Sequence, residues 1–248
     1  MLFPLIAAFI FGAIFASFAG VIAGRMHTGQ SWISGRSRCD ACGRTLTLID
    51  LLPVLSWLIA RGRCRSCGSR IPFASLAGEV VLGALFALAY HMVGLTLALA
   101  PLLAALVILF ALVLYDVAHT VVPPTLSALL ALCALMYALL SAPGAQAFGF
   151  ALAAAGGIAL ALALLHALSG GRAMGLGDAP VAFSLSLLAA PLALSGLVYS
   201  FWIGAVVGII VLVRTPAGHR MGIEVPFVPF LAAGYLLVFF TQWNVFPW

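Results

Sequence analysis

Two aspartates stand out in a chain that carries very little charge. Only 7% of the 248 residues are charged, whereas 65% are hydrophobic. Asp116 ends one apolar segment in the string LVLYD, and Asp178 opens another in the string GLGD. A charged side chain costs about 2.5–3.5 kcal/mol at the centre of a bilayer, so a carboxylate retained beside an apolar segment is a candidate for function.

Paired carboxylates carry a specific chemistry. Two that share one site do not both ionise readily, so one stays protonated while the other acts as a base. In aspartic proteases the base takes a proton from water and the neutral partner polarises the scissile carbonyl. Gly175 and Gly177 would let backbone and substrate approach Asp178 closely. A GxGD string alone is weak evidence, because glycine-rich membrane chains produce it by chance. Taken singly, each aspartate could also simply mark a helix end.

Four cysteines form a second group, in the strings CDAC and CRSC. The two CxxC pairs are separated by 21 residues, which is close to zinc-ribbon spacing. A redox role would need only one such pair. The surrounding segment, 25–72, has little apolar content and would need a metal in order to fold. The spacing therefore predicts a structural zinc site whose ligands are Cys39, Cys42, Cys64 and Cys67. Neighbouring arginines would favour the thiolates that bind zinc.

Long apolar runs must position these groups. Such runs favour membrane-spanning helices over the short alternating segments of a β-barrel. The apolar segments are 1–24, 73–92, 95–115, 124–142, 147–168, 179–195, 197–213 and 225–245. One helix over 179–213 would be about 52 Å long against a hydrocarbon core of about 30 Å, so we place a break near Ser195–Gly196, with a bend at Pro191. The prediction is an all-α polytopic membrane protein of about eight transmembrane helices, with a cytoplasmic zinc loop between the first and second.

Arginine placement predicts the topology. Eight of the eleven basic residues, all of them arginine, lie between residues 25 and 70, which makes that loop cytoplasmic. No charge precedes Arg25, so the first segment is expected to be a span and not a cleaved signal peptide. With eight spans, both termini are periplasmic, and the chain ends outside with the interfacial aromatic residues Trp243, Phe246 and Trp248. Both aspartates then lie at the cytoplasmic face, as do the remaining arginines Arg172, Arg214 and Arg220. The net charge of +5 is a topology signal, and no nucleic-acid partner is expected.

These features together resemble the type IV prepilin peptidases, aspartic peptidases of the bacterial inner membrane. The resemblance rests on FAGVIAGR at the end of the first span, the four-cysteine loop with its phrase LSWLIARGRCR, Glu79 after it, YDVAHTVVP, GLGD, and PFVPFLAAG in the last span. It implies that Asp116 and Asp178 are catalytic and that the four cysteines bind zinc. It further implies cleavage of the short basic leader of type IV prepilins or type II secretion pseudopilins at the cytoplasmic face. Many members also methylate the new N-terminus with S-adenosylmethionine.

Several departures from the family pattern lie in the N-terminal part, which is associated with methyl transfer, whereas another follows GLGD, where Ala179 and Pro180 replace a common lysine. Gly20 and Leu51 stand where the family usually has asparagine, and Ala74 stands where it usually has arginine. We therefore predict leader cleavage with weak or absent methyl transfer. Glu79 is a supporting residue that would pair with a loop arginine or hold the substrate or methyl donor. The expected domains are a first helix over 1–24, the zinc loop over 25–72 and a transmembrane aspartic peptidase over 73–248.

Two alternatives stay open from the sequence. Intramembrane proteases of the signal-peptide-peptidase and presenilin type also pair a YD with a GLGD string, as in Tyr115–Asp116 here. They carry a PAL triplet near their last spans, which this chain lacks, and they have no cytoplasmic four-cysteine loop. In the second alternative, the chain is a non-enzymatic zinc-bearing membrane scaffold and the aspartates are structural. Aspartate variants that lose cleavage but keep zinc and fold would exclude the scaffold.

Overall fold

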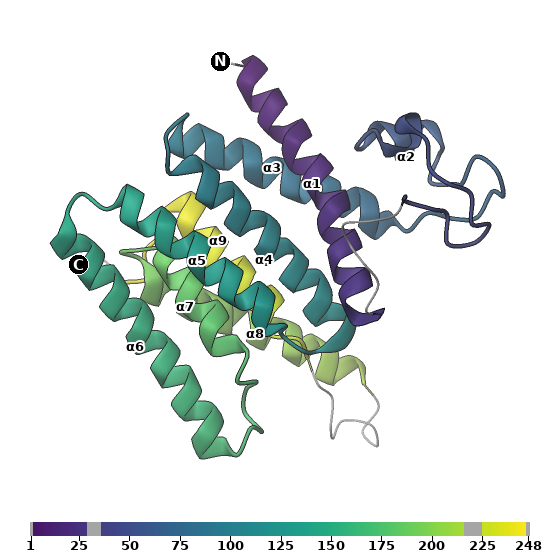
Figure 1. Cartoon of the computed structure of the whole chain (residues 1–248). Coiled ribbons are helices and arrows are strands. Elements are labelled where there is room, and N and C mark those ends of the chain that lie inside the picture. Colours follow the sequence, from purple (N-terminus) through teal and green to yellow (C-terminus); the bar gives the residue numbers. More distant parts are fainter. Residues whose placement is uncertain (1, 29–35, 216–224, 247–248) are drawn as a thin grey trace. The chain divides into compact units, whose positions relative to one another are not determined.

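The computed structural model describes residues 2–28, 36–215 and 225–246, and helices are the main secondary structure of these ranges (Figure 1). Eight apolar helices occupy the eight predicted segments, which confirms the all-helical polytopic fold. They are α1 (Leu2–Thr28), α3 (Phe73–Val93), α4 (Leu99–His119), α5 (Pro124–Ser141), α6 (Ala145–Ser169), α7 (Asp178–Leu188), α8 (Ala193–Arg214) and α9 (Val228–Thr241). The loop after α1 adds a 3₁₀ turn, η1 (Leu48–Leu51), and a short helix, α2 (Leu55–Ile59). Arg220 and Trp248, used above to predict the topology, lie outside the described residues.

Helix length divides the eight apolar helices into two groups. Within the described ranges, six of them are long and apolar enough to cross a membrane: α1, α3, α4, α5, α6 and α8. The other two helices are shorter, since α7 has 11 residues and α9 has 14. At 1.5 Å per residue they are about 16 and 21 Å long, less than the thickness of a hydrocarbon core. The segment that carries Asp178 is therefore one of the two short helices.

The predicted break near Ser195–Gly196 is wrong by several residues. α7 ends at Leu188 and α8 begins at Ala193, so the break surrounds Pro191, and Ser195 and Gly196 lie in the first turn of α8. Proline lacks the N–H that a continuing helix needs. Glycine at position 196 is explained by packing, because a Cβ there would lie 2.6 Å from Cδ1 of Tyr235 on α9. Gly196 thus permits close packing between α8 and α9 and does not break a helix.

Contacts divide the chain into two compact units, residues 1–94 and 95–248. In the N-terminal unit, α1 and α3 cross closely at two glycines. A Cβ on Gly12 would lie 2.6 Å from the carbonyl oxygen of Leu82, and one on Gly83 would lie 2.9 Å from that of Phe9. Small residues at a crossing let two membrane helices pack backbone against backbone. α3 therefore packs in the same compact unit as α1. The predicted peptidase domain over 73–248 is defined by function, and it stays a prediction.

The C-terminal unit is built around α7. This short helix contacts α5, α6, α8 and α9, and Figure 1 shows it beside α5 and α6. Nine of its 11 residues are buried. Ser186 on α7 and Tyr235 on α9 satisfy each other in this interior, with 2.8 Å between their hydroxyl oxygens. Asp178, the first residue of α7, is consequently attached to the most enclosed helix of the unit.

Candidate active site and metal centre

Asp116 lies in the last turn of α4 and is 4% exposed. Its Oδ2 accepts a hydrogen bond from the backbone N–H of Val228, at 3.1 Å. Val228 is the first residue of α9, where N–H groups have no partner within the helix and the helix dipole favours an anion. The sequence analysis did not find this partner. Pro229, at the second position of α9, marks a helix start there, but it does not show that this start faces Asp116.

Asp178 is the first residue of α7 and is 6% exposed. Its Oδ2 accepts a hydrogen bond from the N–H of Gly175 at 3.1 Å. The two predicted glycines each have a steric reason. A Cβ on Gly175 would lie 3.3 Å from Oδ2 of Asp178, and a Cβ on Gly177 would lie 2.6 Å from Cβ of Val122. The GLGD loop therefore packs directly against the connection that follows α4.

The structure brings the two aspartates together within one unit. α4 and α7 both pack on α5 and on α9. Gly177, just before α7, lies against Val122, just after α4, so the start of α7 is close to the end of α4. The two residues are 62 positions apart in the sequence, yet they lie at the neighbouring ends of these two helices. Since both side chains are buried, the unit holds two carboxylates in a common, largely enclosed region.

The four cysteines of the N-terminal unit also come together. Their sulfur atoms all lie within 4.8 Å of one another. The two CxxC segments have the same local fold, repeated after 25 residues. In each segment, the N–H of the first cysteine donates to the carbonyl oxygen of the residue five positions later. The N–H of the glycine that follows the second cysteine donates to the carbonyl oxygen of the first cysteine. The bonds are Cys39–Arg44 at 2.9 Å, Gly43–Cys39 at 2.8 Å, Cys64–Ser69 at 2.8 Å and Gly68–Cys64 at 2.9 Å. Gly43 and Gly68 both have φ of +70°, which glycine adopts without strain.

This donor set fits zinc. Four thiolates at the usual zinc–sulfur distance form a tetrahedron with edges of about 3.8 Å. The sulfur atoms of Cys39 and Cys67 are 3.9 Å apart, and all four cysteines are free thiols. Hydrogen bonds from the backbone N–H groups of Cys42 and then Ala41 lower the pKa of Cys39 to about 6. The backbone, more than the neighbouring arginines, favours the thiolate at this position.

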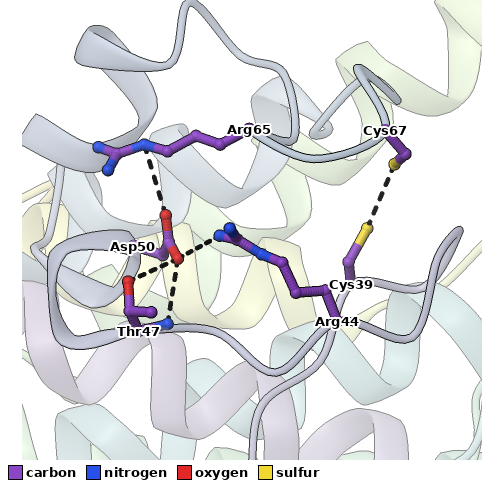
Figure 2. A network of polar contacts seen from close by, with 6 residues as sticks. All are labelled: Cys39, Arg44, Thr47, Asp50, Arg65 and Cys67. Carbon is purple, nitrogen blue, oxygen red and sulfur yellow. Dashed lines mark hydrogen bonds and ion pairs between the residues drawn. The ribbon is translucent and has the colours of Figure 1, made fainter.

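Asp50 links the two CxxC segments, and the sequence analysis did not assign it this role. Figure 2 shows its carboxylate between Arg44, next to the first segment, and Arg65, within the second. Oδ2 also accepts hydrogen bonds from the N–H and hydroxyl of Thr47, at 3.0 and 2.8 Å. These bonds from Thr47, followed by the two arginine charges, lower the pKa of Asp50. An ionised Asp50 therefore ties both halves of the cysteine cluster to one turn.

Glu79 connects three parts of the N-terminal unit. Oε1 accepts a hydrogen bond from the hydroxyl of Ser17 on α1 at 2.8 Å, and Oε2 accepts one from the N–H of Val54 at 2.7 Å. Val54 has φ of 62° and ψ of −50°, and the N–H of Leu55 donates to the carbonyl of Pro53 at 2.6 Å. This conformation is a γ-turn of the rare, strained kind. Glu79 thus holds a strained turn at the start of α2, while the predicted pairing with a loop arginine and the predicted ligand contact stay predictions.

Comparison with known proteins identifies the family of the chain. Residues 10–93 match the family model of the bacterial peptidase A24 N-terminal domain. The prepilin leader peptidase/N-methyltransferase of Bacillus subtilis is 33% identical over 232 residues, which cover 93% of this chain and 92% of the relative. That of Myxococcus xanthus is 34% identical over 227 residues, covering 88% of this chain and 67% of the relative. No solved structure matches. The chain therefore belongs to the prepilin leader peptidase/N-methyltransferase family.

Proposed function

We propose that this protein is a membrane aspartic endopeptidase in which Asp116 and Asp178 form the catalytic pair. The observation that carries the proposal is their placement: two buried carboxylates from different helices lie in one enclosed region, each fixed on one side by a backbone N–H. The relatives are named for prepilin leader cleavage, so the proposed substrates are the leaders of type IV prepilins or type II secretion pseudopilins.

Each carboxylate has one oxygen for position and one for chemistry. Oδ2 of Asp116 accepts from the N–H of Val228, and Oδ2 of Asp178 accepts from that of Gly175. In the proposed mechanism, the Oδ1 atoms face water and substrate. The ionised aspartate removes a proton from water, and the water oxygen attacks the scissile carbonyl carbon. The protonated aspartate donates to the carbonyl oxygen. When the tetrahedral intermediate collapses, the carbon–nitrogen bond breaks and the leaving amine takes a proton from the pair.

The membrane setting suits a substrate that is itself anchored by an apolar helix. Asp116 ends a helix long enough to span the membrane, and Asp178 begins a short buried one, so the pair lies at helix ends. The proposed location is the bacterial inner membrane, with both termini periplasmic and both aspartates at the cytoplasmic face, where the arginine-rich loop also lies. A leader bearing positive charge would remain on that side while its helix stays in the bilayer.

Zinc has a structural role in this proposal. Cys39, Cys42, Cys64 and Cys67 would hold it, and the bound ion would supply the folding free energy that the short, polar loop lacks. The family assignment disfavours a protease of the signal-peptide-peptidase type. A non-enzymatic scaffold would not explain why two neighbouring carboxylates are buried.

Aspartate variants test the proposal directly. Purified wild-type protein in lipid nanodiscs should cleave a prepilin, whereas Asp116→Asn and Asp178→Asn should each lose at least about 10²-fold in rate, because either loss removes one of two proton-transfer groups. Asp40→Asn, which changes an exposed aspartate of the cysteine loop, is the matched control and should cleave normally. Circular dichroism and zinc content should be unchanged in all three. Cleavage by either active-site variant at the wild-type rate would exclude the pair.

A further inference from the structure

We infer that His166 is a positioning residue that orients Asp178 through the peptide group between Met174 and Gly175. This inference rests on the proposed function of Asp178. Nδ1 of His166, in the last turn of α6, lies 2.8 Å from the carbonyl oxygen of Met174. The N–H of Gly175 belongs to the same peptide group and donates to Oδ2 of Asp178 at 3.1 Å. One peptide unit therefore bridges the imidazole and the candidate catalytic carboxylate.

The direction of this chain of hydrogen bonds follows from the groups themselves. A carbonyl oxygen only accepts, so Nδ1 of His166 carries the proton that lies between it and Met174. A peptide whose carbonyl accepts a hydrogen bond becomes a better donor at its N–H, and the bond from that N–H is strengthened by about 10–30%. His166 thereby both fixes the plane of this peptide and strengthens its bond to Asp178.

The loop is shaped so that this contact forms. Gly170 and Gly171 follow α6 with φ of +61° and +77°, and the N–H of Gly171 returns to the carbonyl of His166 at 2.9 Å. The hydroxyl of Ser169 accepts the N–H of Ala173 at 3.2 Å. A Cβ on Gly171 would lie 3.2 Å from Cε1 of His166, so the loop passes closely over the imidazole that it contacts. Met174 itself is 8% exposed.

A second role for a last-turn histidine is simple stabilisation of the helix end. The two roles make different demands. Helix stabilisation depends on a positive charge near the last carbonyls, which asparagine lacks, whereas positioning needs a donor at the place of Nδ1. Asparagine places its amide nitrogen at the same number of bonds from the backbone as Nδ1 of histidine, and leucine has the same branching without a donor. Comparing these two substitutions separates the roles.

The experiment uses the full-length protein in nanodiscs with a prepilin substrate. His166→Leu should lower kcat about tenfold with KM unchanged, because a hydrogen bond that orients the catalytic group is lost while substrate contacts remain. His166→Asn should restore most of the rate. Hydrogen exchange of the amides over 170–178 should be faster in His166→Leu and near wild type in His166→Asn. His91→Leu, which changes the last-turn histidine of α3, is the matched control and should alter neither readout.

The outcomes are separable from those of the proposed function. Unchanged hydrogen exchange over 170–178 in His166→Leu would overturn the inference whatever the activity. So would an unchanged kcat in that variant, or an asparagine variant as slow as the leucine variant. Cleavage by Asp178→Asn would instead contradict the proposed function, and the exchange measurement would then still decide whether His166 holds this loop.

Discussion

At the scale of single residues, the candidate active site depends on backbone groups as much as on side chains. Asp116 is held by the N–H of Val228, and Asp178 by the N–H of Gly175. Neither donor is visible as a residue type in the sequence, because every residue except proline carries an N–H. The glycines are visible, and the structure gives Gly177 the tighter environment of the two in the GLGD string.

Gly177→Ala should therefore impair the enzyme more than Gly175→Ala. The new methyl group would lie 2.6 Å from Cβ of Val122, which cannot yield without moving backbone, whereas at Gly175 the nearest atom is 3.3 Å away. Overpacking of this kind costs about 1–3 kcal/mol. We expect Gly177→Ala to lower both thermal stability and prepilin cleavage, and Gly177→Ala with Val122→Gly to recover part of both. Gly149→Ala, at a position with open space, is the control. Equal activities of the two single variants would refute the steric argument.

Asp50 gives a second prediction at this scale, with a defined pH dependence. Because its pKa is lowered in the folded loop, its ionised form stabilises the loop, and this contribution is lost only as pH falls through the folded pKa. From pH 8 to 6 the carboxylate stays fully ionised. Asp50→Asn should weaken zinc binding several-fold in a chelator competition, and the ratio to wild type should be constant across that window. Asp40→Asn should bind as wild type does. A ratio that changes between pH 8 and 6 would point to another titrating group.

At the scale of elements, the bilayer made most of the fold predictable. Eight apolar runs became eight apolar helices, because only an internally bonded backbone is tolerated in hydrocarbon. The error at Ser195–Gly196 arose where a packing contact with Tyr235, and not a break, explains the glycine. The aspartates and cysteines were identifiable because their residue types are rare here. The roles of Val228, His166 and Asp50 were not, since each depends on which distant segments the fold brings together.

The cysteine cluster supports a prediction about one element, the loop between α1 and α3. Apart from η1 and α2, its described part is held by turns, by two isolated bridges and by the paired CxxC segments. The purified protein should contain about one zinc, bound by four thiolates. Cys39→Ser with Cys64→Ser should release it and make the loop protease-sensitive, while Cys133→Ser, at a cysteine in α5, should do neither. Metal analysis that finds no zinc in protein prepared without chelators would contradict this assignment.

At the scale of the whole molecule, the residues proposed for leader cleavage and the positions linked by family resemblance to methyl transfer lie in different units. Asp116 and Asp178 lie in the unit 95–248, whereas the cysteine cluster and the three departures from the family pattern lie in the unit 1–94. Cleavage can then persist when methyl transfer does not, because no residue of the proposed catalytic pair belongs to the N-terminal unit. The departures Gly20, Leu51 and Ala74 are all exposed, and a Cβ on Gly20 would meet nothing within 4 Å. None of the three is a buried residue, so the family's polar residues can be introduced there without placing a polar group in the core.

The variant Gly20→Asn, Leu51→Asn, Ala74→Arg should therefore fold, cleave prepilin at the wild-type rate and methylate the product more than wild type does. Methyl transfer needs a place for a cationic donor and a polar group near the new amine, and the three restored side chains add polar groups where this chain has none. Mass spectrometry of processed prepilin, with and without S-adenosylmethionine, measures the fraction that gains one methyl group. Wild type should show little or none. The same three substitutions combined with Asp178→Asn should give neither product, because methylation requires a freed N-terminus. Near-complete, donor-dependent methylation by the wild-type protein would show that the apolar residues at these positions are tolerated and that the chain is already bifunctional.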